Sequence, residues 1–408
     1  MSLKWFASKT VRTAEDLCKH VKRILAAQRD LLSPEAVDAV ETALRETKTA
    51  VAQHAGDEII KQRIAELETI ANAKLKPYPN AGIRENIEVI LVALAVAMGI
   101  RTFVAQPFKI PTGSMQPTLF GVTYQNFREQ PGVKPPGVFE RIYEACVFGS
   151  FYHYQECEED GGELAGIGQP DHFLKFFNKQ SILVHYPSGD KVYTFWMTPD
   201  DGFISRASGD HIGIEKGQKF KKGEAIIDFK ETAGDHLFVD RMSYNFRHPK
   251  RGEIIVFETK GIGNGYFQLP PDQFYIKRMV AMGGENVQIG NDRHLIINGK
   301  RLDKDTPHFE NVYSFDPTVR ANDSHYSGHL NQTVADQMGE FQLANSLPLF
   351  PDQNTVYPVP ANHYMVMGDN TANSFDSRAW GDFSRTNVIG KYFFVYWPFS
   401  KRFGCGIK

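Results

Sequence analysis

Three segments of the sequence carry side chains whose types and spacing could support catalysis. The first runs from Ile110 to Leu119, where Ser114 follows a glycine and lies between prolines. Proline restricts both its own backbone and that of the preceding residue, so this segment would present one hydroxyl on a rigid, exposed chain. Taken alone, such a segment is more typical of a proline-rich linker than of a catalytic site.

The second segment is the strand-like run 274–284, which has Lys277 near its middle, flanked by Ile276 and Met279. A free lysine has a pKa near about 10.4 and cannot act as a base at pH 7. Burial would remove water from the ammonium and lower this pKa. A neutral lysine can take a proton from a serine hydroxyl, whereas a lysine on a solvated sheet edge cannot.

The third segment, 364–381, is a predicted strand that runs into a loop dense in small polar residues. Ser374 and Ser377 can donate hydrogen bonds there, and Asp376 can pair with Arg378. The alternatives are a polar turn or a calcium loop. The spacing from Asp369 does not match the ligand positions of an EF-hand calcium loop. The 13 histidines form no HExxH pattern of a zinc peptidase. We therefore expect neither a metal nor a cofactor.

The elements around these segments differ between the two parts of the chain. Residues 1–82 have the apolar periodicity of helices, with predicted starts at Thr13 and at Ser33-Pro34, and indicate a helical hairpin or short coiled coil. We expect this arm to be a spacer, the alternative being a module that docks a protein partner. From residue 106 onward, short β-branched runs separated by turn residues predict a mainly β domain, including a hairpin of 181–186 with 191–196.

The most apolar window, Val89–Ile100, is compatible with either a buried core helix or a membrane anchor. Its 12 residues would span roughly 18 Å, less than the ~30 Å core of a bilayer, although neighbouring apolar residues could extend it. Lys74, Lys76 and Arg84 precede the window, which favours a cytoplasmic N-terminus if the helix crosses a membrane.

Composition excludes several classes of protein. The chain has 408 residues, 46 Lys plus Arg against 48 Asp plus Glu, and a net charge of -2, so no overall basic field exists to bind nucleic acid. The mean hydropathy of -0.36 excludes a protein made mostly of membrane helices. Four cysteines cannot form a disulfide framework, although Cys146 and Cys157 could pair or remain free thiols.

Together the three segments resemble the bacterial type I signal peptidases, a Ser–Lys protease family. The resemblance covers about a third of the chain, with the boxes in the family order. The matching boxes are Ser114–Leu119, Arg251–Phe257, Tyr275–Arg278, and Gly368–Asn370 followed by Ser374–Arg378. The fold that this resemblance implies is a mainly β catalytic domain, a signal-peptidase-like β-barrel or sheet, with an N-terminal α-helical arm and one transmembrane helix.

The resemblance also implies a role for each matched residue. Ser114 would be the nucleophile and Lys277 the general base, oriented by Ser374. The oxyanion would be bound by the Ser114 N–H and by Thr112, which stands where the family usually has serine. Asp376 with Arg278 and Arg378 would hold the third loop. Shallow apolar pockets for an A-x-A cleavage site would be lined by Ile110, Pro111, Met115, Leu119, Tyr275 and Ile276.

The organisation implied is a cytoplasmic helical arm at 1–82, an anchor at 83–106 and an extracytoplasmic catalytic domain at 107–408, with inserts at about 120–233 and 301–361. We expect a single-pass protein of the bacterial cytoplasmic membrane, whose partners are the lipid bilayer and secretory preproteins. The rival interpretations are a related Ser–Lys membrane protease with a narrower substrate and a non-catalytic membrane scaffold.

Overall fold

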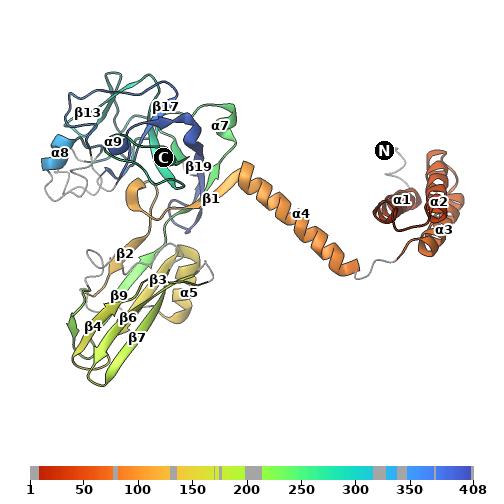
Figure 1. Cartoon of the computed structure of the whole chain (residues 1–408), viewed down its shortest axis with the longest axis horizontal. Coiled ribbons are helices and arrows are strands. Elements are labelled where there is room, and N and C mark those ends of the chain that lie inside the picture. The colour runs from red at the N-terminus through yellow and green to blue at the C-terminus, as the bar shows by residue number, and fades with distance from the viewer. Residues whose placement is uncertain are drawn as a thin grey trace. The chain divides into compact units, whose positions relative to one another are not determined.

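The computed structural model describes residues 9–76, 81–128, 136–169, 171–173, 177–197, 214–315, 328–337, 347–371 and 374–405. The chain forms two compact units, one up to Leu94 and one from Ala95. Figure 1 shows the elements, which are predominantly strands after residue 104. The expected fold class, a mainly β domain preceded by a helical region and one long apolar helix, is therefore confirmed.

The N-terminal helices are α1 (Lys9–Gln28), α2 (Pro34–Ala52) and α3 (Asp57–Lys74). All three contact one another, so they form a three-helix bundle rather than a hairpin. Ser33 caps α2 as predicted, since its hydroxyl accepts from the N–H of Ala36 over 3.3 Å. The predicted cap at Thr13 is wrong, because α1 already includes Lys9 and the Thr13 hydroxyl donates to the Lys9 carbonyl. The turn residues Pro77, Pro79 and Asn80 lie outside the described residues.

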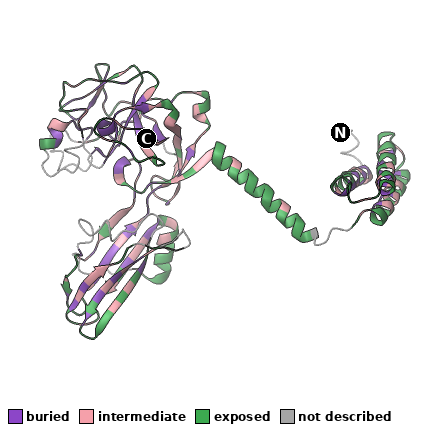
Figure 2. Cartoon of the chain, viewed as in Figure 1, coloured by how far each residue is buried: buried purple, intermediate pink, exposed green. Residues whose placement is uncertain are grey.

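Helix α4 (Ala81–Phe103) is the one described helix long and apolar enough to cross a membrane. Its 23 residues span about 35 Å, which exceeds the hydrocarbon core of a bilayer. The mean hydropathy of its best window is 1.7 and none of that window is buried. Figure 2 shows the helix as mostly exposed. Of the two alternatives for the apolar window, the buried core helix therefore does not apply to the described structure. The helix ends at Phe103, and the last residues of the predicted anchor, Ala105 and Gln106, belong to a strand.

The largest described sheet has eight strands and carries Lys277, whereas Ser114 lies in a turn after its edge strand β1. Seven of them follow the order β1, β10, β19, β11, β12, β17, β18, while β20 pairs with β19. Their bounds are β1 Ala105–Lys109, β10 His236–Asp240, β11 Ile254–Glu258, β12 Phe274–Met282, β17 His363–Met367, β18 Phe383–Ser384, β19 Val388–Trp397 and β20 Gly404–Cys405. Apolar cores lie on its two sides, one including Ile110, Met115 and Leu237, the other Phe257, Val366 and Trp380.

The described residues between 120 and 233 form a β subdomain with two sheets. One sheet pairs β2 (Thr123–Asn126), β9 (Ala225–Thr232) and β3 (Ser150–Glu156). The other holds β5 (Asp171–Phe173), β6 (Phe177–Tyr186), β4 (Gly162–Ile167), β8 (Lys219–Phe220) and β7 (Gly189–Met197). The predicted hairpin is confirmed, since β6 pairs with β7 and Tyr186 stands opposite Gly189. Helix α5 (Val138–Phe148) packs against β3.

The second insert contributes to another small sheet, β15 (Lys300–Arg301), β14 (Leu295–Ile297), β13 (Asn286–Ile289) and β16 (Tyr357–Pro358). It also contains helix α8 (Gln332–Gln337). Short helical turns complete the described chain: η2 (Gly113–Met115), α7 (Ser243–Phe246), α9 (Ser377–Trp380) and η6 (Arg385–Asn387). Although polar in sequence, the insert buries Phe309, Val312 and Phe350 in a core beneath the small sheet.

Candidate active site

Ser114 lies in the short turn η2, just after the edge strand β1. Its side chain is 5% exposed. The backbone of the turn is held by the loop after β17, because the N–H of Asn370 donates to the Ser114 carbonyl over 3.1 Å and Nδ2 of Asn370 to the Gly113 carbonyl over 3.0 Å. The segment is therefore tied to the loop after β17 and is not a linker. Its hydroxyl was expected on an exposed chain, whereas Ser114 is buried.

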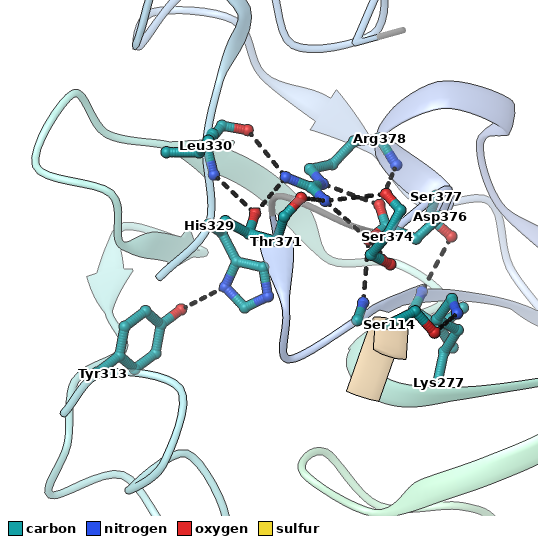
Figure 3. Close-up of polar contacts among 12 residues, drawn as sticks. Ser114, Lys277, Tyr313, His329, Leu330, Thr371, Ser374, Asp376, Ser377 and Arg378 are labelled. Carbon is teal, nitrogen blue, oxygen red and sulfur yellow. Dashed lines mark hydrogen bonds and ion pairs between the residues drawn. The ribbon is translucent and has the colours of Figure 1, made fainter. Parts of the chain in front are cut away.

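Lys277 projects from the middle of β12, opposite Ile255 of β11, and its Nζ donates to the Ser114 hydroxyl over 2.7 Å. The lysine is 5% exposed. Burial lowers its pKa to about 8, although the carboxylates of Asp376 and Asp369 act in the opposite direction. The nucleophile and base candidates, 163 residues apart in sequence, are therefore in direct contact. Figure 3 shows this pair beside the loop that holds Ser374 and Asp376.

Asp376 organises the loop beside this pair and is almost completely buried. Its carboxylate accepts from the Ser374 hydroxyl over 2.7 Å, from the N–H of Gly368 over 3.0 Å, and from two nitrogens of Arg378 over 2.8 and 2.9 Å. Burial would raise the pKa of Asp376, but the charge of Arg378 and these hydrogen bonds outweigh it and lower the pKa. The predicted pairing of Asp376 with Arg378 is present.

Ser374 differs from the expectation in its hydrogen-bond partner. We expected its hydroxyl to bond the amine of Lys277, whereas in the described structure it donates to Asp376. A carboxylate is the stronger acceptor, so the single hydroxyl proton goes there. Gly368 lies directly against Ser374 and the Ser114 carbonyl, where a Cβ atom would overlap both. The loop thus packs on the Ser114–Lys277 pair without a side chain at position 368 between them.

Arg278, which was expected together with Asp376 and Arg378 to hold the third loop, contacts this loop at Asp369. Its Nε and Nη2 donate to the two carboxylate oxygens of Asp369 over 2.7 and 2.5 Å, and its Nη1 donates to the Gly252 carbonyl. The reason is strand geometry: successive residues of β12 point to opposite faces, so Arg278 turns away from the face that Lys277 uses. Thr118, from the nucleophile segment, also donates to Asp369 over 2.5 Å.

A cavity of about 830 Å³ opens beside Ser114 and Lys277, lined mainly by apolar side chains. Four of the six predicted pocket residues line it: Ile110, Pro111, Tyr275 and Ile276. Met115 and Leu119 do not, because both are fully buried in the core under β1. Thr112 lines the same cavity and is exposed, next to Ser114.

Several residues of the site had no role assigned from the sequence. Asp369 and Thr118 stand inside the matched segments, yet only the folded structure shows that both accept hydrogen bonds from Arg278. Phe274 and Phe375 add aromatic walls to the cavity. Their exposure to it depends on how the strands and loop assemble, so no local pattern identifies them.

No cluster of metal-ligating side chains is found in the described part of the chain. Cys146 and Cys157 are both free thiols, the first exposed and the second buried. The sequence left open whether Cys146 and Cys157 form a disulfide or remain free, and in the structure they do not form one.

Comparison with known proteins places this arrangement in a family. The family model described as signal peptidase, peptidase S26, matches residues 83–137 and 229–397, more than half of the chain. Residues 1–82, 138–228 and 398–408 lie outside the match.

Individual relatives agree with the family match. Signal peptidase I of Pseudomonas fluorescens is 28% identical over 57% of this chain and 80% of its own length. Signal peptidase I of Aquifex aeolicus is 32% identical over 40% of this chain and 69% of its own. The crystal structure of a signal peptidase I from Enterococcus faecalis aligns with 36% of this chain and 97% of its own at 24% identity, with a TM-score of 0.24. The chain therefore belongs to the signal peptidase family, peptidase S26, and is a serine peptidase that cleaves signal peptides.

Proposed function

We propose that this chain is a membrane-bound endopeptidase that removes N-terminal signal peptides from secreted preproteins with Ser114 as nucleophile and Lys277 as general base. The observation that carries the proposal is the 2.7 Å contact between Nζ of Lys277 and Oγ of Ser114 in a buried setting. The experiment that tests it is a processing assay with Ser114→Ala and Lys277→Ala.

The chemistry follows from this contact. The neutral amine of Lys277 accepts the hydroxyl proton while Oγ of Ser114 bonds to the scissile carbonyl carbon. Collapse of the tetrahedral intermediate breaks the C–N bond, and the ammonium of Lys277 returns the proton to the leaving amine. A water molecule, deprotonated by Lys277 in its turn, then hydrolyses the ester of Ser114. Asp376 and Ser374 hold the loop against the amine, and Arg278 with Asp369 holds the strand and the turn together.

A non-catalytic scaffold would not need this arrangement. Burying a lysine amine costs free energy unless the group is neutral or paired, and such a cost is characteristic of functional sites. The same burial is what makes Lys277 a base. The scaffold interpretation is therefore the weaker one.

The proposed substrate is an extended preprotein segment whose small side chains, of the A-x-A type, enter the cavity beside Ser114. The apolar lining of this cavity comes from Ile110, Pro111, Tyr275 and Ile276.

We further propose that α4 anchors the chain in the bacterial cytoplasmic membrane. The helical arm would then lie in the cytoplasm, where a protein partner of the arm would meet it. Protease added to intact cells tests the orientation, because digestion of the arm before the β domain would contradict it.

If Lys277 is the base, kcat/KM should depend on pH. Because the Lys277 pKa is about 8, the amine is protonated and inactive at lower pH. With Asp376, Asp369 and Arg378 as its charged neighbours, kcat/KM should rise with pH, roughly tenfold per unit well below pH 8, and level off above it. The measurement is kcat/KM between pH 6 and 10 on a leader peptide without ionisable groups in that range. Activity that falls between pH 6.5 and 8 would contradict Lys277 as the base.

The proposed oxyanion donors are the Ser114 N–H and the Thr112 hydroxyl. Thr112→Ala should lower kcat by about 10²–10³ and leave KM little changed, because a donor to the oxyanion acts mainly in the transition state. Thr112→Ser is the matched control and should retain most activity, since it keeps the hydroxyl and removes only a methyl group. Equal loss in both variants would show that the hydroxyl is not the donor.

A further inference from the structure

The second insert contacts the loop that carries Asp376 through the segment His329–Asn331. The N–H of Leu330 donates to the Thr371 hydroxyl over 3.3 Å, and Nη1 of Arg378 approaches the Leu330 carbonyl at 3.5 Å. The backbone of Leu330 thus acts both as donor and as acceptor in the ring of contacts around Arg378. Figure 3 shows Leu330, Thr371 and Arg378 joined in this way.

Arg378 is fully buried, and each of its three nitrogens is engaged. Nε and Nη2 hold the two oxygens of Asp376, while Nη2 also donates to the Thr371 carbonyl over 3.0 Å. Nη1, on the other side of the guanidinium, donates to the Thr371 hydroxyl and faces Leu330. Because the guanidinium is planar and its donors are fixed, the contacts of Nη1 determine how the Nε–Nη2 edge meets Asp376.

The Leu330 segment is itself anchored rigidly. Nδ2 of the fully buried Asn331 donates to the Ile289 carbonyl over 3.0 Å and to Oδ1 of Asn291 over 2.9 Å. Its Oδ1 accepts from the N–H of Val334 over 2.9 Å at the start of α8. The Leu330 side chain is buried with Val334, Ala335 and Leu347. The hydrogen bonds of Asn331 therefore fix the Leu330 backbone next to the end of strand β13.

We propose that Thr371, with the Leu330 backbone anchored by Asn331, positions Arg378 and through it the Asp376–Ser374 pair beside Lys277. This inference rests on the proposed Ser–Lys function and assigns the second insert a part in it. Thr371 and Asn331 are positioning residues, since they act through Arg378. Neither lines the cavity beside Ser114, so their loss should affect the chemical step more than substrate binding.

The test measures kcat and KM of four full-length variants on a leader peptide in detergent micelles, per mole of folded protein. Thr371→Val removes the hydroxyl with little change of volume and should lower kcat by about 10- to 100-fold, with KM within about twofold of wild type. Thr371→Ser should recover kcat to within about threefold. Asn331→Ala should lower kcat in the same direction. Thr333→Val is the matched control, because the exposed Thr333 hydroxyl of the same insert bonds only the Pro351 carbonyl in the described structure, and it should behave as wild type.

Circular dichroism and melting temperatures establish that each variant is folded, and the inference has distinct ways to fail. If Thr371→Val keeps kcat within twofold of Thr333→Val, Thr371 does not position the site. If Thr371→Ser loses as much as Thr371→Val, the hydroxyl is not responsible. If Asn331→Ala retains full kcat, the insert has no part in positioning. The proposed function fails separately, through an active Ser114→Ala variant, and Ser114→Ala is therefore measured alongside.

Discussion

Replacing Ser114 by alanine is expected to lower the rate of signal-peptide cleavage by a factor of about 10⁴ or more, and replacing Lys277 by alanine should do the same. The first change removes the proposed nucleophilic oxygen, and the second removes the amine 2.7 Å away that is proposed to accept its proton. Because the two residues act as one unit, the double variant should be no less active than either single variant. The measurement is release of mature protein from a preprotein in membranes.

Matched controls separate lost chemistry from lost structure. Ser314→Ala and Lys250→Ala remove the same side chains at exposed positions and should process at the wild-type rate. The melting temperature of Ser114→Ala should stay close to that of wild type, since only one oxygen is lost. If Ser114→Ala and Lys277→Ala both released mature protein at the wild-type rate, the assignment of nucleophile and base would be wrong.

Replacing Asp369 by alanine is expected to destabilise the catalytic domain by about 3–5 kcal/mol. Asp369 is fully buried and Arg278 is 2% exposed, and two hydrogen bonds of 2.7 and 2.5 Å join them. Without the carboxylate, the guanidinium remains buried and uncompensated, which costs far more than a solvent-exposed ion pair contributes. Denaturant unfolding monitored by circular dichroism measures the change.

The exposed pair of Lys179 with Asp171 supplies the control, since its side chains are 37% and 66% exposed. Asp171→Ala should change stability by less than about 1 kcal/mol. A second variant, Asp369→Ala combined with Arg278→Met, should recover part of the loss because it also removes the unpaired charge. A loss from Asp369→Ala no larger than that from Asp171→Ala would show that the buried pair does not stabilise the domain.

The features predicted best from the sequence are those that depend on neighbouring residues. The β6–β7 hairpin followed from two alternating runs around a turn, and the start of α2 from a serine before a proline. The predicted cap at Thr13 failed because an apolar face that includes Val11 extends α1 toward its N-terminus. Local patterns thus identify most elements, but packing decides where some of them begin.

Contacts between distant segments could not be derived in the same way. Met115 and Leu119 stand in the nucleophile segment and were expected to line the pocket, yet both turn into the core beneath β1. Their apolar character is equally compatible with a pocket wall and with a core. Whether these side chains line the pocket or the core depends on which face of the turn η2 packs against the sheet.

The proposed pair of Ser114 and Lys277 was predicted from the order of the segments that resemble a known family, because the matching segments contain both residues. The state of that pair depends on the fold. Lysine becomes a base only when burial lowers its pKa, and burial is a property of the assembled sheet and loop. The charge pairing likewise arises on folding: Arg278 binds Asp369, 91 residues away, because alternation along β12 directs it there and away from Asp376.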